Sequence, residues 1–207
     1  MKKFQENHKA NRKIIRSRYN IEDDCVAICI TGRLAPVKDH FFFLDAIESL
    51  ESQTNKEIKI FIVGDGELRK EIEQRVQLLK NKGIDIVMTS WIFDIAQFNA
   101  GMDIMCLTSK NEGTPVSLIE AQASNLPVIS TDVGGVADIV LENETGFIIS
   151  RKDKVSFIEK LKLLVENDEI RNQMKSKGWE HVHLKLSYKR LALDMETYYK
   201  KLLKVKS

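Results

Sequence analysis

Short apolar runs alternate along this chain with longer segments in which apolar residues recur at helical spacing. Strands buried on both faces of a sheet show continuous apolar character, so these runs are typical of buried strands. They lie at 25–31, 58–63, 84–88, 102–107, 126–130 and 146–149. Helices are expected at 39–50, 67–82 and 114–123, with a short one inside 91–100 and two or three more after 150. This order predicts an α/β fold, a doubly wound, mainly parallel, six-stranded Rossmann-like sheet with a C-terminal helical extension.

The pattern continues through the whole chain without a repeat, a low-complexity segment or a linker, so we interpret residues 1–207 as one domain. A basic segment within 1–20 is expected to form a lead-in helix outside the sheet. A C-terminal helix is expected over 187–204, with an apolar stripe that could pack on its own domain. The stripe consists of Leu191, Met195, Tyr198, Tyr199 and Leu202.

Composition and charge narrow the classes of protein to consider. The 32 basic and 30 acidic side chains are interspersed, without the basic footprint of a nucleic-acid-binding protein. The 3 cysteines do not make a disulfide framework, and the 4 histidines show no metal-ligand spacing. No apolar run reaches the length of a membrane span, and the start of the chain has no signal-peptide core. We therefore expect a cytoplasmic protein, with the inner face of the membrane as a second location that its basic start and Lys-rich last helix would permit.

The densest candidate chemistry lies at 106–120, where the fourth strand passes through a polar loop into a helix. Thr114 is expected to cap this helix, with Pro115 at its first position. A helix N-terminus at the carboxyl edge of a parallel sheet binds anions, and here Glu112 precedes the helix and Glu120 lies inside it. Glu120 stands in an otherwise apolar helix and could accept both hydroxyls of a ribose. An anion site flanked by carboxylates suits a ligand with phosphate and hydroxyl groups, such as a nucleotide sugar.

Cations follow the first strand. Arg33 and Lys38 flank one loop, in which Gly32 permits a close approach of the backbone to a ligand. Together they could neutralise a diphosphate, since Arg can fork two oxygens and Lys acts as a point charge. The alternative is that both are surface cations beside the next helix.

The loops after the second and third strands give weaker signals. Gly64-Asp65-Gly66 is typical of a tight strand-to-helix turn, and Arg69 stands where a dinucleotide fingerprint would need a glycine. Trp91-Ile92-Phe93 is more typical of a core segment, although its backbone groups could meet a base. Because ligands bind at the carboxyl ends of parallel strands, the convergence of all these loops carries more weight than any one of them.

On these residues the chain resembles the C-terminal, donor-binding domain of retaining glycosyltransferases with the two-domain GT-B fold, the glycosyltransferase group 1 or family 4 type. The resemblance covers nearly the whole chain, and it is specific because its motifs occur jointly and in order. They are Gly32-Arg33-Leu34 with Lys38, Ile62-Val63-Gly64-Asp65-Gly66, Glu112 with Glu120-Ala121, the run from Leu126 to Gly135, and Thr145-Gly146-Phe147. Some positions depart from the pattern, since Asp39, Ser90 and Asn125 stand where the family commonly has glycine.

The resemblance implies a role for each loop. Arg33 and Lys38 would hold the donor diphosphate, and Ile92 would meet the base through its backbone. Glu112 would orient the sugar and stabilise positive character at its anomeric carbon, and Glu120 would bind the ribose. The expected catalytic residues are Glu112, Arg33 and Lys38, and the expected donor-binding residues are Gly32, Arg33, Lys38, Gly64, Ile92, Glu112, Gly113, Thr114, Val116 and Glu120.

The implied reaction is transfer of a sugar, with retention and without a metal or cofactor, from a UDP- or GDP-type donor to an acceptor hydroxyl. It would serve polysaccharide or glycoconjugate biosynthesis. A glycan or lipid-linked glycan would be the acceptor, held by an N-terminal domain that precedes such a chain in the family, so the isolated chain is expected to be inactive. In the family the last helix also reaches back toward that domain, so part of its apolar stripe could be exposed in this chain. Peripheral membrane contact is compatible with this interpretation, and nucleic acid is not an expected partner. The alternative is a non-catalytic nucleotide-binding or assembly module, whereas a glycoside hydrolase is disfavoured because Glu112 and Glu120 could not flank one bond.

Overall fold

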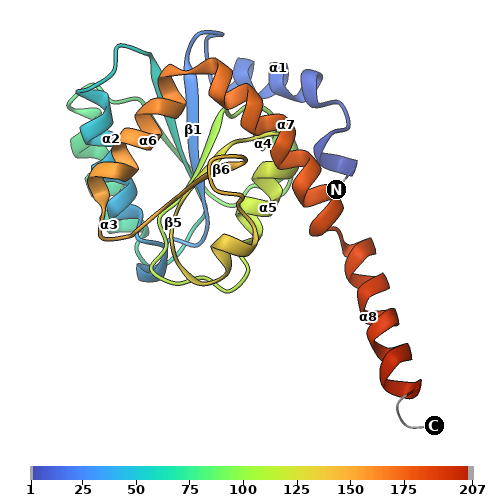
Figure 1. Cartoon of the computed structure of the whole chain (residues 1–207). Coiled ribbons are helices and arrows are strands. Elements are labelled where there is room, and N and C mark those ends of the chain that lie inside the picture. Colours follow the sequence, from blue (N-terminus) through green and yellow to red (C-terminus); the bar gives the residue numbers. More distant parts are fainter. Residues whose placement is uncertain (1, 205–207) are drawn as a thin grey trace.

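The computed structural model describes residues 2–204 and is built on a six-stranded sheet in the order β3-β2-β1-β4-β5-β6 (Figure 1). The strands are β1 (Val26–Thr31), β2 (Ile58–Val63), β3 (Ile86–Thr89), β4 (Ile104–Leu107), β5 (Val128–Thr131) and β6 (Gly146–Ile149). Every neighbouring pair is parallel. The predicted fold class is therefore confirmed, and the strand order reverses direction between β1 and β4, the place where doubly wound sheets bind ligands.

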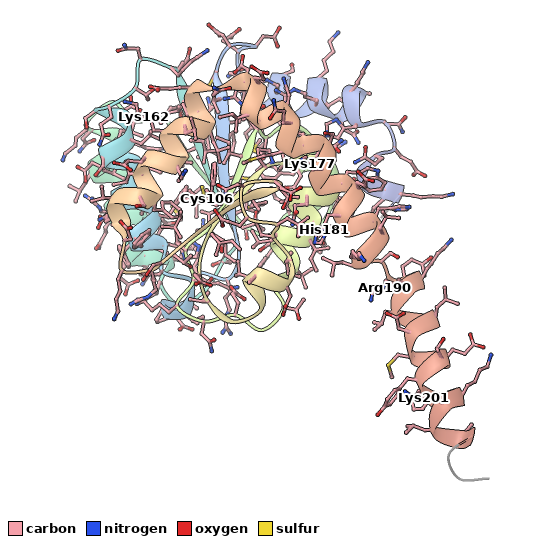
Figure 2. All side chains as sticks on the ribbon, viewed as in Figure 1. Cys106, Lys162, Lys177, His181, Arg190 and Lys201 are labelled. Atoms are coloured by element: carbon pink, nitrogen blue, oxygen red, sulfur yellow. The ribbon has the colours of Figure 1, made fainter. Side chains whose placement is uncertain are left out.

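Helices cover both faces of the sheet. On one face lie α2 (His40–Glu51), α3 (Arg69–Lys80) and α6 (Lys154–Glu166), and on the other lie α1 (His8–Arg18), α4 (Ile95–Ala100) and α5 (Val116–Ala123). Helix α7 (Asp168–Lys185) crosses between them, since Met174 joins the core of the first face and Val182 packs with Ala123 of α5. Short 3-10 turns occur at Lys2–Phe4, Pro36–Lys38 and Gly134–Asp138. Two apolar cores fill the layers between sheet and helices, and Cys106 lies in the interior of the body (Figure 2).

Strands β3 and β5 each begin two residues later than the apolar runs predict, because the first residues of those runs close the preceding helices. The N–H of Ile84 donates to the carbonyl of Leu79, and the N–H of Leu126 donates to that of Ala121. In each case the residue just before has a positive φ, 93° at Gly83 and 58° at Asn125, as in a Schellman cap. Asparagine tolerates this left-handed backbone, so Asn125 fits the conformation that glycine would otherwise supply.

A buried ion cluster fixes α1 to the amino edge of the sheet. Asp103, just before β4, accepts from Arg12 Nη2 at 2.9 Å, from Arg16 Nη1 at 3.0 Å and from the N–H of Ala27 at 3.0 Å. Burial alone would raise the pKa of Asp103, but the nearby Arg12 charge and the Ala27 N–H, together with other cations, hold it below its ordinary value. The lead-in helix is therefore held by charge as well as by apolar contacts.

The last helix, α8 (Tyr188–Lys204), leaves the body of the molecule, and its stripe does not pack on its own domain (Figures 1 and 2). It continues outward from the end of α7, so its apolar side chains meet no surface of the body. Those that stay exposed are Tyr188, Leu191, Leu193, Met195, Tyr198, Tyr199, Leu202 and Leu203. Of the two outcomes expected for the stripe, packing on its own domain was wrong, and exposure is the one observed. Over residues 2–204, every helix is too short or too polar to span a bilayer.

Candidate functional site

Backbone contacts hold the loops after β1 and β2 together at the carboxyl edge of the sheet. The N–H of Leu34 donates to the carbonyl of Asp65 at 2.9 Å, and the N–H of Leu68 donates back to the carbonyl of Leu34 at 3.0 Å. Gly64 has a φ of 141°, and a Cβ there would lie 2.0 Å from the carbonyl oxygen of Gly32. Only glycine fits this close crossing, so Gly64 has a structural reason to be where the sequence motif places it.

The loops after β4 and β5 cross in the same way. The N–H of Gly135 donates to the carbonyl of Gly113 at 3.0 Å. Gly134 has a φ of 50°, and a Cβ there would lie 1.7 Å from the carbonyl oxygen of Glu112. The N–H of Lys110 bonds to the carbonyl of Val37 at 2.7 Å, which ties the β4 loop to the β1 loop. The convergence predicted for the loops after β1, β2 and β4 is therefore present in the backbone, and the β5 loop joins them.

Lys38 and Glu112 meet at the centre of these loops. The Nζ of Lys38 lies 2.6 Å from Oε1 of Glu112, and Oγ of Ser109 donates to the same oxygen at 2.6 Å. The side chains are 23% and 10% exposed, so the pair is partly screened from solvent yet open on one side. Thr108 holds the backbone beneath Lys38 by donating to the carbonyls of Lys38 and Asp39. Sequence reasoning missed Ser109, although its position three residues before Glu112 is a spacing at which such a bond forms.

Arg33 differs from Lys38 because its side chain is exposed and has no ion pair among residues 2–204. It stands on the same β1 loop and is available to an incoming anion. Gly32 is less constrained than Gly64, since a Cβ there would lie 3.5 Å from Cε of Lys38, an ordinary contact. Packing therefore does not by itself explain a glycine at position 32.

His40 follows this loop but does not add a third cation. It lies fully buried at the start of α2. Burial, followed by the charge of Lys38, lowers the pKa of His40 to about 4. Its imidazole is therefore neutral at physiological pH, and the cations of this loop are Arg33 and Lys38 alone.

The start of α5 differs from the sequence prediction. Its first helical residue is Val116, and the capping position is occupied by Pro115, whose ψ of 90° is not helical. Thr114 is exposed, stands one residue too early and makes no capping hydrogen bond, so the expected cap was wrong. Without a side-chain cap, the amides of Val116 and Ser117 lack intrahelical partners and are free to meet an anion.

Glu120 lies one turn into α5 and is half-buried. Burial raises the pKa of its carboxyl group, and the charge of Lys3 offsets this only in part. Among the described residues no side chain or amide donates to its carboxylate oxygens, so they have acceptor capacity to spare. Val116, one turn earlier, is 58% exposed, which leaves this face of the helix open at its start.

The β3 loop is less buried than expected. Ile92 packs against the core, whereas Trp91 is 55% exposed and Phe93 is fully exposed. The interpretation of the whole tripeptide as core was therefore wrong. Oγ of Ser90 reaches Oδ2 of Asp65 at 3.2 Å, which links this loop to the β2 loop. Sequence reasoning assigned neither residue a part in the site.

Comparison with known proteins now identifies the family. The model of glycosyl transferases group 1 matches residues 11–181. The chain belongs to this family.

No group of His, Cys, Asp or Glu side chains within residues 2–204 has the arrangement needed to hold a metal ion.

The chain is similar to two named glycosyltransferases. It is 26% identical over 194 residues to the capsular polysaccharide biosynthesis glycosyltransferase CapM of Staphylococcus aureus, covering 94% of this chain and 51% of CapM. It is 32% identical over 146 residues to the UDP-Gal:alpha-D-GlcNAc-diphosphoundecaprenol alpha-1,3-galactosyltransferase of Escherichia coli, covering 70% of this chain and 38% of that enzyme. The chain thus spans about half the length of these group 1 relatives, or less.

Solved structures agree on the fold. The C-terminal domain of the group 1 protein LpcC from Francisella tularensis superposes with a TM-score of 0.75 at 22% identity, covering 86% of this chain and 93% of that domain. HepE of Anabaena in complex with UDP superposes with a TM-score of 0.83 at 17% identity, covering 93% of this chain and 53% of HepE. This group 1 chain therefore has the architecture of one half of a GT-B glycosyltransferase.

Proposed function

We propose that this chain is the donor-binding half of a retaining, metal-independent glycosyltransferase that uses a nucleoside diphosphate sugar. The observation that carries the proposal is the meeting of Lys38 and Glu112 at 2.6 Å between the open start of α5 and exposed Arg33. The two cations, Arg33 and Lys38, and the free amides at the start of α5 suit a diphosphate. The carboxylate of Glu112 beside them suits the hydroxyl groups of a sugar. The UDP in HepE and the UDP-Gal in the name of the Escherichia coli relative support a UDP-type donor, with GDP as the alternative.

The chemical task is to stabilise the negative charge that grows on the leaving diphosphate. Arg33, Lys38 and the amides of Val116 and Ser117 would do this as preorganised donors, without a metal. Glu112 would orient the sugar and stabilise positive character at the anomeric carbon. Ile92 would meet the base through its backbone, and Glu120 would accept the ribose hydroxyls.

The acceptor would be a glycan or a lipid-linked glycan, held by a further domain across the carboxyl edge. Support comes from the relatives, which are about twice as long, and from the diphosphoundecaprenol in the name of the Escherichia coli enzyme. The exposed apolar side chains of α8 fit a role in packing against that further domain. A lipid-linked acceptor would bring the enzyme to the inner face of the membrane as a peripheral protein.

Calorimetric titration with UDP, GDP and ADP, and with their sugars, tests the proposal. We expect one nucleoside diphosphate to bind. Arg33→Ala and Lys38→Ala should each weaken it by about 1.5–3 kcal/mol, the range for hydrogen bonds to charged groups. Arg18→Ala and Lys162→Ala are matched controls, because these cations lie on α1 and α6 away from the carboxyl edge. If both site variants bind the diphosphate as the wild type does, Arg33 and Lys38 do not hold the phosphates. If an intact two-domain protein binds donor but transfers no sugar, the non-catalytic module is favoured.

A further inference from the structure

Asp65 joins the β1 loop to the β3 loop. Its backbone carbonyl accepts from the N–H of Leu34 at 2.9 Å, next to Arg33 on the β1 loop. Its Oδ2 atom accepts from Oγ of Ser90 at 3.2 Å, two residues before Ile92 on the β3 loop. One residue therefore contacts both the loop proposed for the diphosphate and the loop proposed for the base.

The carboxylate of Asp65 is itself held in place. Its Oδ1 accepts from the N–H of Gly66 at 2.8 Å, and its Oδ2 also meets Nη1 of Arg69 at 3.1 Å. Arg69 is in turn fixed by Glu73, whose Oε1 lies 2.8 Å from its Nε. The Gly66 N–H and the Arg69 charge, with the Ser90 hydroxyl, lower the pKa of Asp65, so this carboxylate is ionised and oriented at neutral pH.

The two contacts of Asp65 differ in strength. The contact of Asp65 with the β1 loop is reinforced by close backbone packing, because a Cβ at Gly66 would lie 2.5 Å from the carbonyl oxygen of Leu34. Toward the β3 loop, no backbone hydrogen bond joins 64–68 to 90–94 within the described part of the chain. Beyond the end of the β2–β3 ladder, and apart from the packing of Ile92 on the core, the Ser90 hydroxyl is the group that bonds the β3 loop to the β2 loop.

We propose that Ser90 and Asp65 are positioning residues that set the distance between the base end and the diphosphate end of the donor site. The inference rests on the proposed function. The bond between them would favour a whole nucleotide over an isolated diphosphate, because only the nucleotide reaches both loops.

Ser90→Ala tests this by removing the hydroxyl and little else. The probes are inorganic pyrophosphate and whichever of UDP, GDP and ADP binds the wild-type chain most tightly, each titrated by calorimetry. Losing one exposed hydrogen bond should weaken the nucleoside diphosphate by about 3- to 10-fold. Pyrophosphate affinity and the melting temperature of the ligand-free protein should not change. Asp65→Asn should likewise weaken binding of the nucleoside diphosphate and leave the affinity for pyrophosphate unchanged.

Two controls keep the result specific. Ser90→Thr retains a hydroxyl and should restore nucleoside diphosphate binding. Ser52→Ala removes an exposed hydroxyl that bonds at the end of α2 and should leave both ligands unaffected. The inference would be overturned if Ser90→Ala lost affinity equally for pyrophosphate and nucleoside diphosphate, or lost none. Either result would leave the proposed function standing. A wild-type chain that binds no nucleoside diphosphate would overturn both.

Discussion

The Nζ of Lys38 lies 2.6 Å from Oε1 of Glu112, so two residues proposed to hold different parts of the donor hold each other in the ligand-free protein. This pair keeps a partly buried cation and carboxylate satisfied when no ligand is present. A diphosphate that approaches Lys38 meets the negative charge of Glu112 as well. Sugar hydroxyls beside Glu112 would turn that repulsion into hydrogen bonds, so the pair should disfavour the bare diphosphate relative to the sugar nucleotide.

Replacing Glu112 should therefore separate the two ligands. In Glu112→Ala, Lys38 loses its partner and the local negative charge disappears, so the bare nucleoside diphosphate should bind about 2- to 10-fold more tightly. The matching nucleotide sugar should gain less or lose affinity, because its hydroxyls lose their acceptor. Calorimetry on both ligands gives the ratio, and Glu159→Ala, an exposed acid on α6, is the control. Weaker binding of the bare diphosphate in Glu112→Ala would contradict this account.

Glu120 should show its role through pH as well as through mutation. An ionised carboxylate accepts ribose hydroxyls, and burial raises the pKa of Glu120. Nucleoside diphosphate binding should therefore begin to weaken, as pH falls, above the pKa of about 4.3 of an ordinary glutamate. Pyrophosphate, which lacks a ribose, should not share this dependence.

The matched variant is Glu120→Gln. It should weaken the nucleoside diphosphate at neutral pH, remove the additional pH dependence and leave the melting temperature of the ligand-free protein nearly unchanged. A large drop in that melting temperature would instead show that the carboxylate satisfies groups of the protein itself.

The Asp103 cluster leads to a prediction about stability that is independent of the donor. Arg16 is 5% exposed, so Asp103→Asn would leave a buried cation without its charge partner and destabilise the fold by about 3–5 kcal/mol. The folded pKa of Asp103 lies below its unfolded value of about 3.9, so its stabilisation is present above that value and is lost as pH falls through the folded pKa. Urea unfolding of both proteins from about pH 1 to about pH 7 measures the difference, because stabilisation of this kind is lost between about pH 5 and about pH 1. It should shrink toward acid pH, and a difference that stays constant would refute the assignment.

The sequence predicted the sheet well because continuous apolar runs are a local signal, and parallel strands place their carboxyl ends at one edge whatever their exact bounds. That is why the convergence of the loops bearing Arg33, Lys38, Gly64 and Glu112 could be predicted. The start of α5 could not, since it depends on the ψ of Pro115, which the loop geometry sets. The Ser90–Asp65 bond was also out of reach, because it depends on where distant segments meet. The choice between a packed and an exposed α8 could not be made for the same reason.

The last prediction is that this chain alone binds donor but does not transfer the sugar to an acceptor. Every proposed donor-binding residue lies on the carboxyl edge of one sheet, and all the strands of that sheet are already paired within residues 2–204. Nothing in this described part of the chain stands opposite the edge as a second wall. Alignment of the acceptor hydroxyl with the anomeric carbon can lower the activation barrier by about 7–11 kcal/mol. A domain that forms only one side of the cleft cannot provide this alignment.

Incubation of the purified chain with nucleotide sugars and a broad panel of acceptors measures this directly, with a full-length group 1 relative and its own substrates as the positive control. We expect slow donor hydrolysis at most, because bound donor stays open to water on its acceptor side. Donor binding must be verified in the same samples by calorimetry. An absence of transfer can then be attributed to missing alignment of the acceptor, and not to failure to bind the donor. Glycosylation of an acceptor at a rate near that of the full-length control would show that the second wall is not needed.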